Sequence, residues 1–119
     1  MRDYKKLQVW EKAHRFVLAI YQATAGFPSD ERFGLTREIR RSATSVPSNI
    51  AEGCGRESEP DFARFPSIAA GSASEVAYQL LLAHDLRYLE ARTYEDLDTQ
   101  VQEIKRMLNS FIQRLRANS

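Results

Sequence analysis

Residues 33–56, FGLTREIRRSATSVPSNIAEGCGR, are the stretch that decides the fold. Their apolar side chains recur every three or four residues, which places them on one stripe of an α-helix. The stripe keeps its phase across Val46-Pro47, and we therefore predict one continuous helix here. Because proline lacks the amide donor and crowds the preceding turn, the helix is expected to be kinked near Pro47. The stripe consists of Leu35, Ile39, Ala43, Val46 and Ile50.

The other face of this helix combines arginines with short hydroxyl and amide side chains. Ser, Thr and Asn compete with the backbone for hydrogen bonds and lower helix propensity, whereas a face that is merely solvated tends to use Lys and Glu. This composition indicates that contacts beyond simple solvation hold the face. The candidate contact residues are Arg37, Arg40, Arg41, Ser45, Ser48, Asn49 and Glu52.

Two roles for this polar face remain open. Its three arginines could pair with the phosphate oxygens of a nucleic acid, while the neighbouring Ser and Asn side chains donate further hydrogen bonds. Alternatively, Arg41 could pair with Glu38 and Glu52 across subunits, since Arg and carboxylates on adjacent turns pair readily. Asn49 would complete that intersubunit network.

The stretch after residue 57 predicts a long third helix. Ser58 and Asp61 form a capping-box-like pair, and a proline between them suits the first helical turn. Pro66 is expected either to bend the helix at Phe62 or to delay its regular start to about Phe65. Further on, AYQLLLA at residues 77–83 is apolar almost all round.

A bundle helix needs only one buried face, so this apolar excess favours a subunit interface on the third helix. A central helix that is well wrapped by its own domain is the other explanation. The interface residues that we expect are Ser72, Tyr78, Gln79, Leu81 and Leu82.

Two further helices complete the pattern. The first carries a stripe at Trp10, Ala13, Val17, Ile20 and Thr24, and the second helix is then expected to begin at an N-cap, Ser29. The fourth is expected to begin at Thr93 and repeats apolar residues from 97 to 115 at strict heptad spacing. Four such helices with short connections predict an all-α, antiparallel up-down four-helix bundle, with residues 1–119 as a single domain.

Two strings carry a family resemblance: IRRSATSVPSNIAEG at residues 39–53 and IAAGSASE at residues 68–75. They closely resemble the bacterial four-helix-bundle family of proteins encoded within intervening sequences of 23S rRNA genes. A relative of that family is the accessory variability protein of diversity-generating retroelements. The similarity extends from Leu7 to Leu108 and departs from the family pattern at Pro66. The resemblance implies a ring-shaped homopentamer, and the retroelement relatives imply nucleic acid and a nucleic-acid-processing protein as partners.

Composition places the chain among ordinary globular proteins. It has 119 residues, 43% hydrophobic and 28% charged, and a net charge of +1. Residues 2–41 hold nine Lys/Arg and five Asp/Glu, so the basic charge belongs to the first helix and the start of the second. A single cysteine, Cys54, allows no intrachain disulfide. With no signal-like or membrane-spanning apolar run in the sequence, we expect a cytoplasmic protein without a membrane partner.

The sequence offers little catalytic chemistry. Neither GxGxxG nor GxxxxGK[ST] occurs, and His14 and His84 lack Glu-x-x-His spacing. Cys54 lies near Glu52 and Glu57, whose charges would raise the thiol pKa and weaken it as a nucleophile. We therefore expect no catalytic residue, metal, cofactor or small-molecule substrate.

The expected function is a non-enzymatic, homo-oligomeric adaptor, pentameric on the family pattern, that docks RNA or a ribonucleoprotein. The alternative is a structural or protein-interaction scaffold without affinity for nucleic acid. Because non-specific affinity scales with the phosphates that are neutralised, the modest charge of this chain weighs against strong binding by one subunit. A ring of subunits would concentrate the basic segment on one face.

Overall fold

The computed structural model describes residues 2–117, and this part of the chain is helical without any strand. Two single 3-10 turns, η1 (Tyr4–Lys6) and η2 (Ser29–Glu31), precede the first and second long helices. The long helices are α1 (Gln8–Thr24), α2 (Leu35–Cys54), α3 (Glu59–Asp85) and α4 (Ala91–Ala117). The predicted all-α class and the four helices are confirmed.

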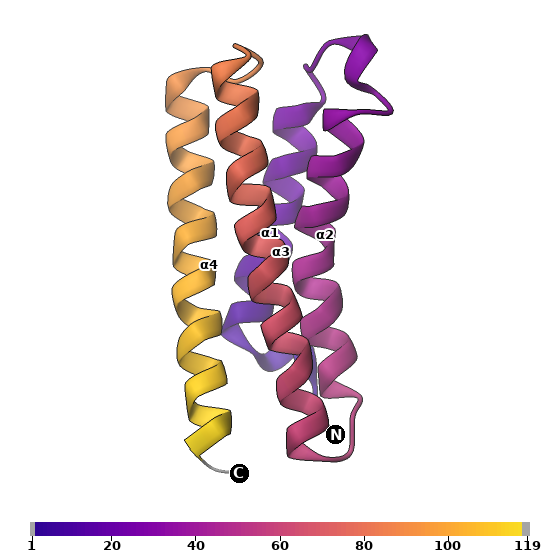
Figure 1. Cartoon of the computed structure of the whole chain (residues 1–119), viewed down its shortest axis with the longest axis vertical. Coiled ribbons are helices and arrows are strands. Elements are labelled where there is room, and N and C mark those ends of the chain that lie inside the picture. The colour runs from indigo at the N-terminus through magenta and orange to yellow at the C-terminus, as the bar shows by residue number, and fades with distance from the viewer. Residues whose placement is uncertain (1, 118–119) are drawn as a thin grey trace.

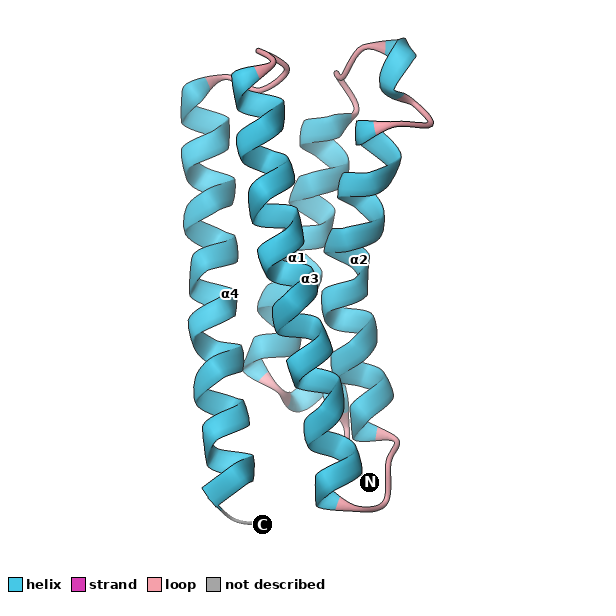
Figure 2. Ribbon diagram, viewed as in Figure 1, coloured by secondary structure: helices cyan, strands magenta, loops and turns pink. Residues whose placement is uncertain are grey.

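The four helices lie side by side along the long axis of a molecule that measures 45 × 23 × 20 Å (Figure 1). Each helix packs against two others, because α1 and α3 both contact α2 and α4. The α1–α2 and α3–α4 connections lie at one end, and the α2–α3 connection lies at the other (Figure 2). The polar face of α2 is therefore bordered by α1 on one side and by α3 on the other.

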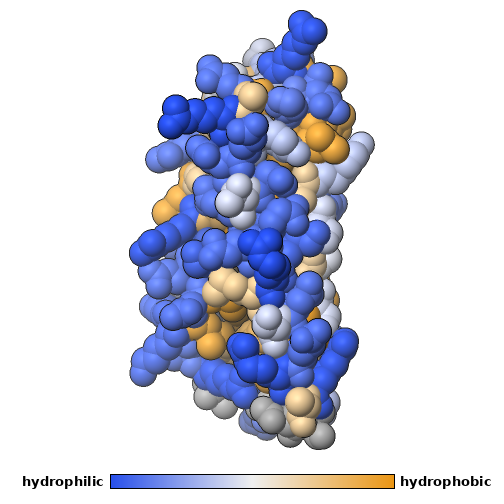
Figure 3. Space-filling model, turned by 90° about the vertical axis from the view of Figure 1, so that its left-hand side faces the viewer, coloured by the Kyte–Doolittle hydropathy of each residue, from blue (hydrophilic) through white to orange (hydrophobic). Residues whose placement is uncertain are grey.

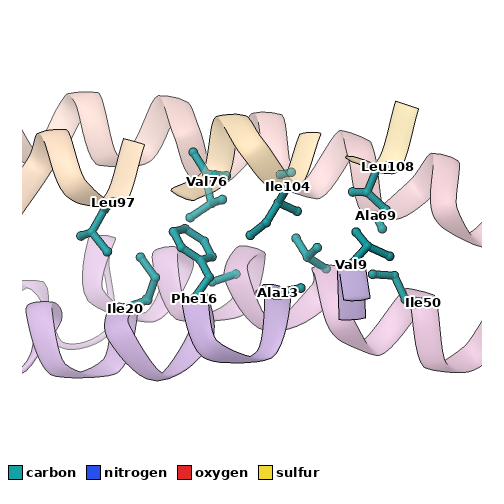
Figure 4. Close-up of a cluster of buried hydrophobic side chains, with 14 of the residues drawn as sticks. Val9, Ala13, Phe16, Ile20, Ile50, Ala69, Val76, Leu97, Ile104 and Leu108 are labelled. Carbon is teal, nitrogen blue, oxygen red and sulfur yellow. The ribbon is translucent and has the colours of Figure 1, made fainter. Parts of the chain in front are cut away.

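A continuous apolar core runs along the middle of the bundle, with side chains from all four helices (Figure 4). In α1 the predicted positions Ala13, Ile20 and Thr24 are confirmed as buried, whereas Trp10 and Val17 are wrong by one position. The buried residues are Val9, Ala13, Phe16, Ile20 and Thr24. Trp10 and Val17 are only partly buried. Trp10 instead packs at the edge of the bundle, with its ring 4.9 Å from that of Tyr4.

The second helix is continuous, as predicted, and Pro47 lies inside it. The predicted start at Ser29 is wrong, since α2 begins six residues later at Leu35. The cap is a local contact, since Glu31 Oε1 accepts a hydrogen bond from the Leu35 amide at 3.0 Å, and Tyr88 in the α3–α4 connection holds Glu31 by donating to its Oε2 at 3.0 Å. A carboxylate held from a neighbouring connection thus satisfies a donor of the first turn.

The third helix begins at Glu59, and the Ser58 side chain accepts from the Asp61 amide at 3.3 Å, as the capping pattern predicts. Pro66 lies inside the helix, so the predicted delay to Phe65 is wrong. The fourth helix begins at Ala91, and the predicted Thr93 cap is wrong as well. The Tyr94 amide already donates to the Glu90 carbonyl at 2.9 Å, which places Thr93 within the first turn.

Candidate functional site

A shallow groove of about 910 Å³ runs along α2, from the end of α1 and the α1–α2 connection to the middle of α2. We call it the arginine groove. Its lining holds four arginines and no aspartate, glutamate, histidine or cysteine. A lining of one charge sign attracts anions, and carboxylates just outside it, Glu38 and Glu75, pair with only one of the four arginines, Arg41. The lining residues are Tyr21, Arg32, Phe33, Thr36, Arg37, Arg40, Arg41, Thr44, Ser45 and Ser48.

Arg40 is fixed against the end of α1. Its Nε donates to Thr24 Oγ1 at 2.9 Å and its Nη2 donates to the Tyr21 carbonyl at 3.3 Å. Its guanidinium also lies 4.5 Å from the centre of the Tyr21 ring, a cation–π contact. Because helix C-termini carry partial negative charge, this position suits a cation. Arg40 therefore holds α1 to α2 and presents only part of its donor fork to the groove.

Arg41 is paired with acids. Its Nη2 lies 3.0 Å from Glu38 Oε2 and 3.1 Å from Glu75 Oε2, so it links α2 to α3. The hydrogen bonds that Arg41 donates to Glu38 and the charges of both carboxylates raise the pKa of Arg41 above its ordinary value. These acids offset most of its charge toward a ligand.

Arg37 and Arg32 are different. Arg37 is exposed and has no hydrogen-bond or ion-pair partner within residues 2–117. Arg32 is exposed too, and its guanidinium lies 5.2 Å from the centre of the Phe33 ring. Their positive charges are therefore the ones that the groove offers most fully to a ligand.

The residues of the predicted intersubunit network have separate partners within one chain: Arg41 pairs with Glu38, whereas Asn49 and Glu52 contact neither of them. Asn49 Nδ2 donates to Ser45 Oγ at 2.9 Å, and Ser45 Oγ lies 2.8 Å from Ser72 Oγ, which fastens α2 to α3. Glu52 pairs instead with Arg56 at 2.8 Å. Ser48 is exposed on the groove, whereas Asn49 and Glu52 lie outside its lining.

The structure thus brings five of the seven predicted contact residues into one groove and adds five more. Sequence reasoning missed Tyr21, Arg32, Phe33, Thr36 and Thr44. A signal for two of them was present, because an aromatic residue beside an arginine at 32–33 lies just before the arginine-rich helix. Phe33 is the most exposed large hydrophobic residue of the described chain, at 75%.

Of the five predicted interface residues on α3, two are exposed on its outer surface, and the placement of Gln79 there is wrong because it is buried. Tyr78 is 61% exposed and Leu81 is also exposed, while Leu82 is half-buried. Gln79 is buried, and its Oε1 has no hydrogen-bond partner among the described residues. Ser72 is occupied by its contact with Ser45.

Two further residues of this surface were not predicted. Ile68 is exposed, and a Cβ added to Gly71 would meet nothing within 4 Å. We call Ile68, Gly71, Tyr78 and Leu81 the α3 face. By contrast, the side of the molecule that carries α4 is mostly hydrophilic, with small and scattered apolar spots (Figure 3).

Cys54 is buried at the end of α2, and burial raises its thiol pKa, helped by Asp3 and opposed by Arg2. The predicted direction is confirmed, but the main cause is burial and not the charges of Glu52 and Glu57. No group of three or more His, Cys, Asp or Glu side chains within residues 2–117 is placed to hold a metal ion. None of the described helices is both long and apolar enough to cross a membrane.

Comparison with known proteins gives a family and a fold. A family model described as 23S rRNA-intervening sequence protein matches residues 5–110. The chain is also similar to a crystal structure of a protein with unknown function from the S23 ribosomal protein family of Bacteroides thetaiotaomicron VPI-5482. The two are 29% identical with a TM-score of 0.82, over 88% of this chain and 95% of that one. A comparison with curated proteins gave no match.

Proposed function

The chain belongs to the family of 23S rRNA-intervening sequence proteins, and from this premise we propose that it is a non-enzymatic, homo-oligomeric adaptor that docks RNA. The RNA lies in the arginine groove in this proposal. The observation that carries it is the groove lining, with four arginines and no carboxylate. Phosphate contacts of this kind position a nucleic acid without reading its sequence.

The four arginines contribute unequally. Arg32 and Arg37 have no acidic partner, whereas Arg41 is offset by two carboxylates and Arg40 is held by α1. One subunit therefore neutralises about two phosphates, which for a single strand gives a slope of roughly −1.4 in log K against log salt. Binding by one subunit is weak at physiological salt, and useful affinity requires several copies on one RNA.

The copies come from self-association through the α3 face. Exposed Ile68, Tyr78 and Leu81 offer apolar surface, and Gly71 lets a neighbouring backbone approach closely. We propose a ring-like assembly of antiparallel up-down bundles. The connections at alternating ends of the molecule support the antiparallel order (Figure 1). The number five follows the family resemblance, since an apolar face predicts association and not its symmetry.

The non-enzymatic character is part of the proposal. The groove lining has no histidine, carboxylate or thiol to act as a general base, and the thiol of Cys54 is buried with a raised pKa. A single free cysteine also suits the reducing cytoplasm, where we place the protein.

Charge reversal in the groove tests the proposal. We would measure the affinity of the full chain for a labelled RNA by fluorescence anisotropy at low salt, for Arg37→Glu and for the control Arg106→Glu. Both residues are exposed, and α4, which carries Arg106, does not pack against α2. Arg37→Glu is expected to weaken binding at least tenfold, with the control within about threefold, since a groove contact loses a phosphate partner and gains repulsion.

Equal losses in the two variants would show that binding is spread over the surface, and the groove assignment would then fall. The alternative, a scaffold that binds only protein, is favoured by the internal contacts of Arg40 and Arg41. An oligomer that is indifferent to RNA at any salt concentration would select that alternative.

A further inference from the structure

We infer that the arginine groove selects single-stranded over double-stranded RNA, because Phe33 provides a stacking platform for an unpaired base. This selectivity rests on the proposed function of the groove and names the class of RNA that it takes.

Phe33 has no role in the core that explains its presence. Its side chain is 75% exposed, and it is absent from the apolar cluster that the buried side chains form. Its recorded ring contact is with the guanidinium of Arg32, 5.2 Å from the ring centre. An aromatic ring left in water beside two arginines without acidic partners is the composition of a surface that stacks bases and holds their phosphates.

Hydrogen bonds in the α1–α2 connection fix the backbone around Phe33 and keep its ring exposed. Glu31, two residues before, accepts hydrogen bonds from the Leu35 amide and from the Tyr88 hydroxyl, so the turn is fastened at both ends. A Cβ at position 34 would lie 2.6 Å from Glu31 Oε1, so a larger residue than Gly34 would have to displace the carboxylate from this contact. The ring is thus presented by a fixed turn, which lowers the ordering cost of binding.

A second aromatic residue lies in the same groove. Tyr21 is exposed on α1, and one arginine, Arg40, stacks on its ring at 4.5 Å while donating to the Tyr21 carbonyl. The groove therefore holds two pairs of an aromatic ring and a guanidinium group, Phe33 with Arg32 and Tyr21 with Arg40. Stacking on such rings is tolerant of sequence, because every base has a π-face.

Duplex RNA does not fit this chemistry as well as a single strand. In a duplex both faces of each base are already stacked, so the Phe33 ring can reach only the backbone or an end. Recognition of double-stranded RNA also relies on 2′-hydroxyl and phosphate contacts across the minor groove, whereas exposed rings take the splayed bases of single strands. Phosphate pairing by Arg37 serves both forms of RNA, and stacking on Phe33 serves one.

The test compares a labelled 12-nucleotide oligo(A) with a blunt-ended RNA duplex of 12 base pairs, by anisotropy at low salt with the full chain. Wild type is expected to prefer the single strand. Phe33→Ala should weaken single-strand binding by about 5- to 100-fold, the range of one lost base–aromatic stack, and leave duplex binding unchanged. Leu18→Ala removes a large apolar side chain that is 53% exposed on α1, outside both the groove lining and the α3 face, and serves as the control. Phe33→Trp should restore the preference, and 2-aminopurine in the strand should be quenched by wild type and not by Phe33→Ala.

Three results would overturn the inference. If Phe33→Ala weakens neither RNA, or weakens both equally, while Arg37→Glu still abolishes binding, the stacking role falls and the proposed function stands. If Phe33→Ala lowers the mass of the oligomer in light scattering, Phe33 is a subunit contact instead. If wild type binds neither RNA, the proposed function and the inference fall together. An unchanged thermal midpoint for Phe33→Ala is expected, since the side chain is exposed, and excludes misfolding as the cause.

Discussion

Two glycines in neighbouring helices should respond to alanine with opposite signs. Gly53 is buried near the end of α2, where an added Cβ would lie 2.9 Å from Phe65 Cβ and 2.9 Å from Phe62 Cδ1. Phe65 Cβ is attached directly to the α3 backbone, so the clash is relieved only if the two helices move apart. Gly71 on α3 would meet nothing within 4 Å.

The magnitudes follow from these surroundings. Alanine gains about 1 kcal/mol over glycine in a helix interior, and forcing a methyl group into a packed core costs about 1–3 kcal/mol. Two contacts at 2.9 Å place the cost at Gly53 in the upper part of that range, about 2–3 kcal/mol, so Gly53→Ala should lower the free energy of unfolding by about 1–2 kcal/mol. Gly71→Ala should raise it by about 0.5–1 kcal/mol. For a chain of this size the two thermal midpoints should differ by roughly 8 °C or more.

The assay is urea and thermal unfolding followed by circular dichroism, with both variants at several protein concentrations. The sign of the change in the free energy of unfolding is compared at the lowest protein concentration, because any association adds stability that depends on concentration. The close α2–α3 approach at Gly53 is refuted if Gly53→Ala is as stable as wild type. If Gly71→Ala stabilises the subunit and lowers the mass of the oligomer, the α3 face is the site of association.

Three further predictions concern individual side chains. Ser42 Oγ is buried without a partner, so Ser42→Ala should be neutral or stabilise by up to about 1 kcal/mol, whereas Ser45→Ala should cost about 1 kcal/mol in urea unfolding. Arg40→Ala should lower the free energy of unfolding by about 1–3 kcal/mol, because it loses two hydrogen bonds and a ring contact. Arg37→Ala should change it by no more than about 0.5 kcal/mol. Equal effects would contradict the conclusion that Arg40 is structural and Arg37 is free for a ligand. The hydrogen bond to Glu31 raises the pKa of the Tyr88 hydroxyl. The protonated hydroxyl therefore stabilises the folded chain below about pH 10, and this stabilisation is lost as the pH rises through the higher pKa of the folded state. Melting curves recorded against pH should show that Tyr88→Phe removes this alkaline loss.

Much of the fold could be predicted because the apolar stripes are strong local signals. The stripe of α2 kept its phase through Pro47, and the structure places Pro47 inside one helix. Helix starts were less predictable. Ser29 and Thr93 look like caps in the sequence, yet Glu31 caps α2 from the connection before it and α4 begins before Thr93. Glu31 is itself held by Tyr88 from the α3–α4 connection, a contact that the spacing of cap residues along the chain does not reveal.

For the candidate site too, the local pattern could be predicted, whereas the contacts between helices could not. The arginine-rich face of α2 was visible in the sequence, and five of its seven predicted residues line the groove. Their individual roles were not visible, because Arg40 reaches Thr24 on α1 and Arg41 reaches Glu75 on α3. Spacing along one helix cannot identify partners on its neighbours. Phe33 was missed as a site residue since its exposure depends on the turn that Glu31 fastens.

The central claim is that the assembled protein holds RNA electrostatically in the arginine groove. The most direct test is multi-angle light scattering of wild type and Arg37→Glu, with and without a single-stranded RNA, at low and high salt. The account predicts an oligomer that gains the mass of RNA at low salt, loses it at high salt, and gains none with Arg37→Glu while the oligomer stays intact. A wild-type mass that does not change with RNA at low salt would contradict the account.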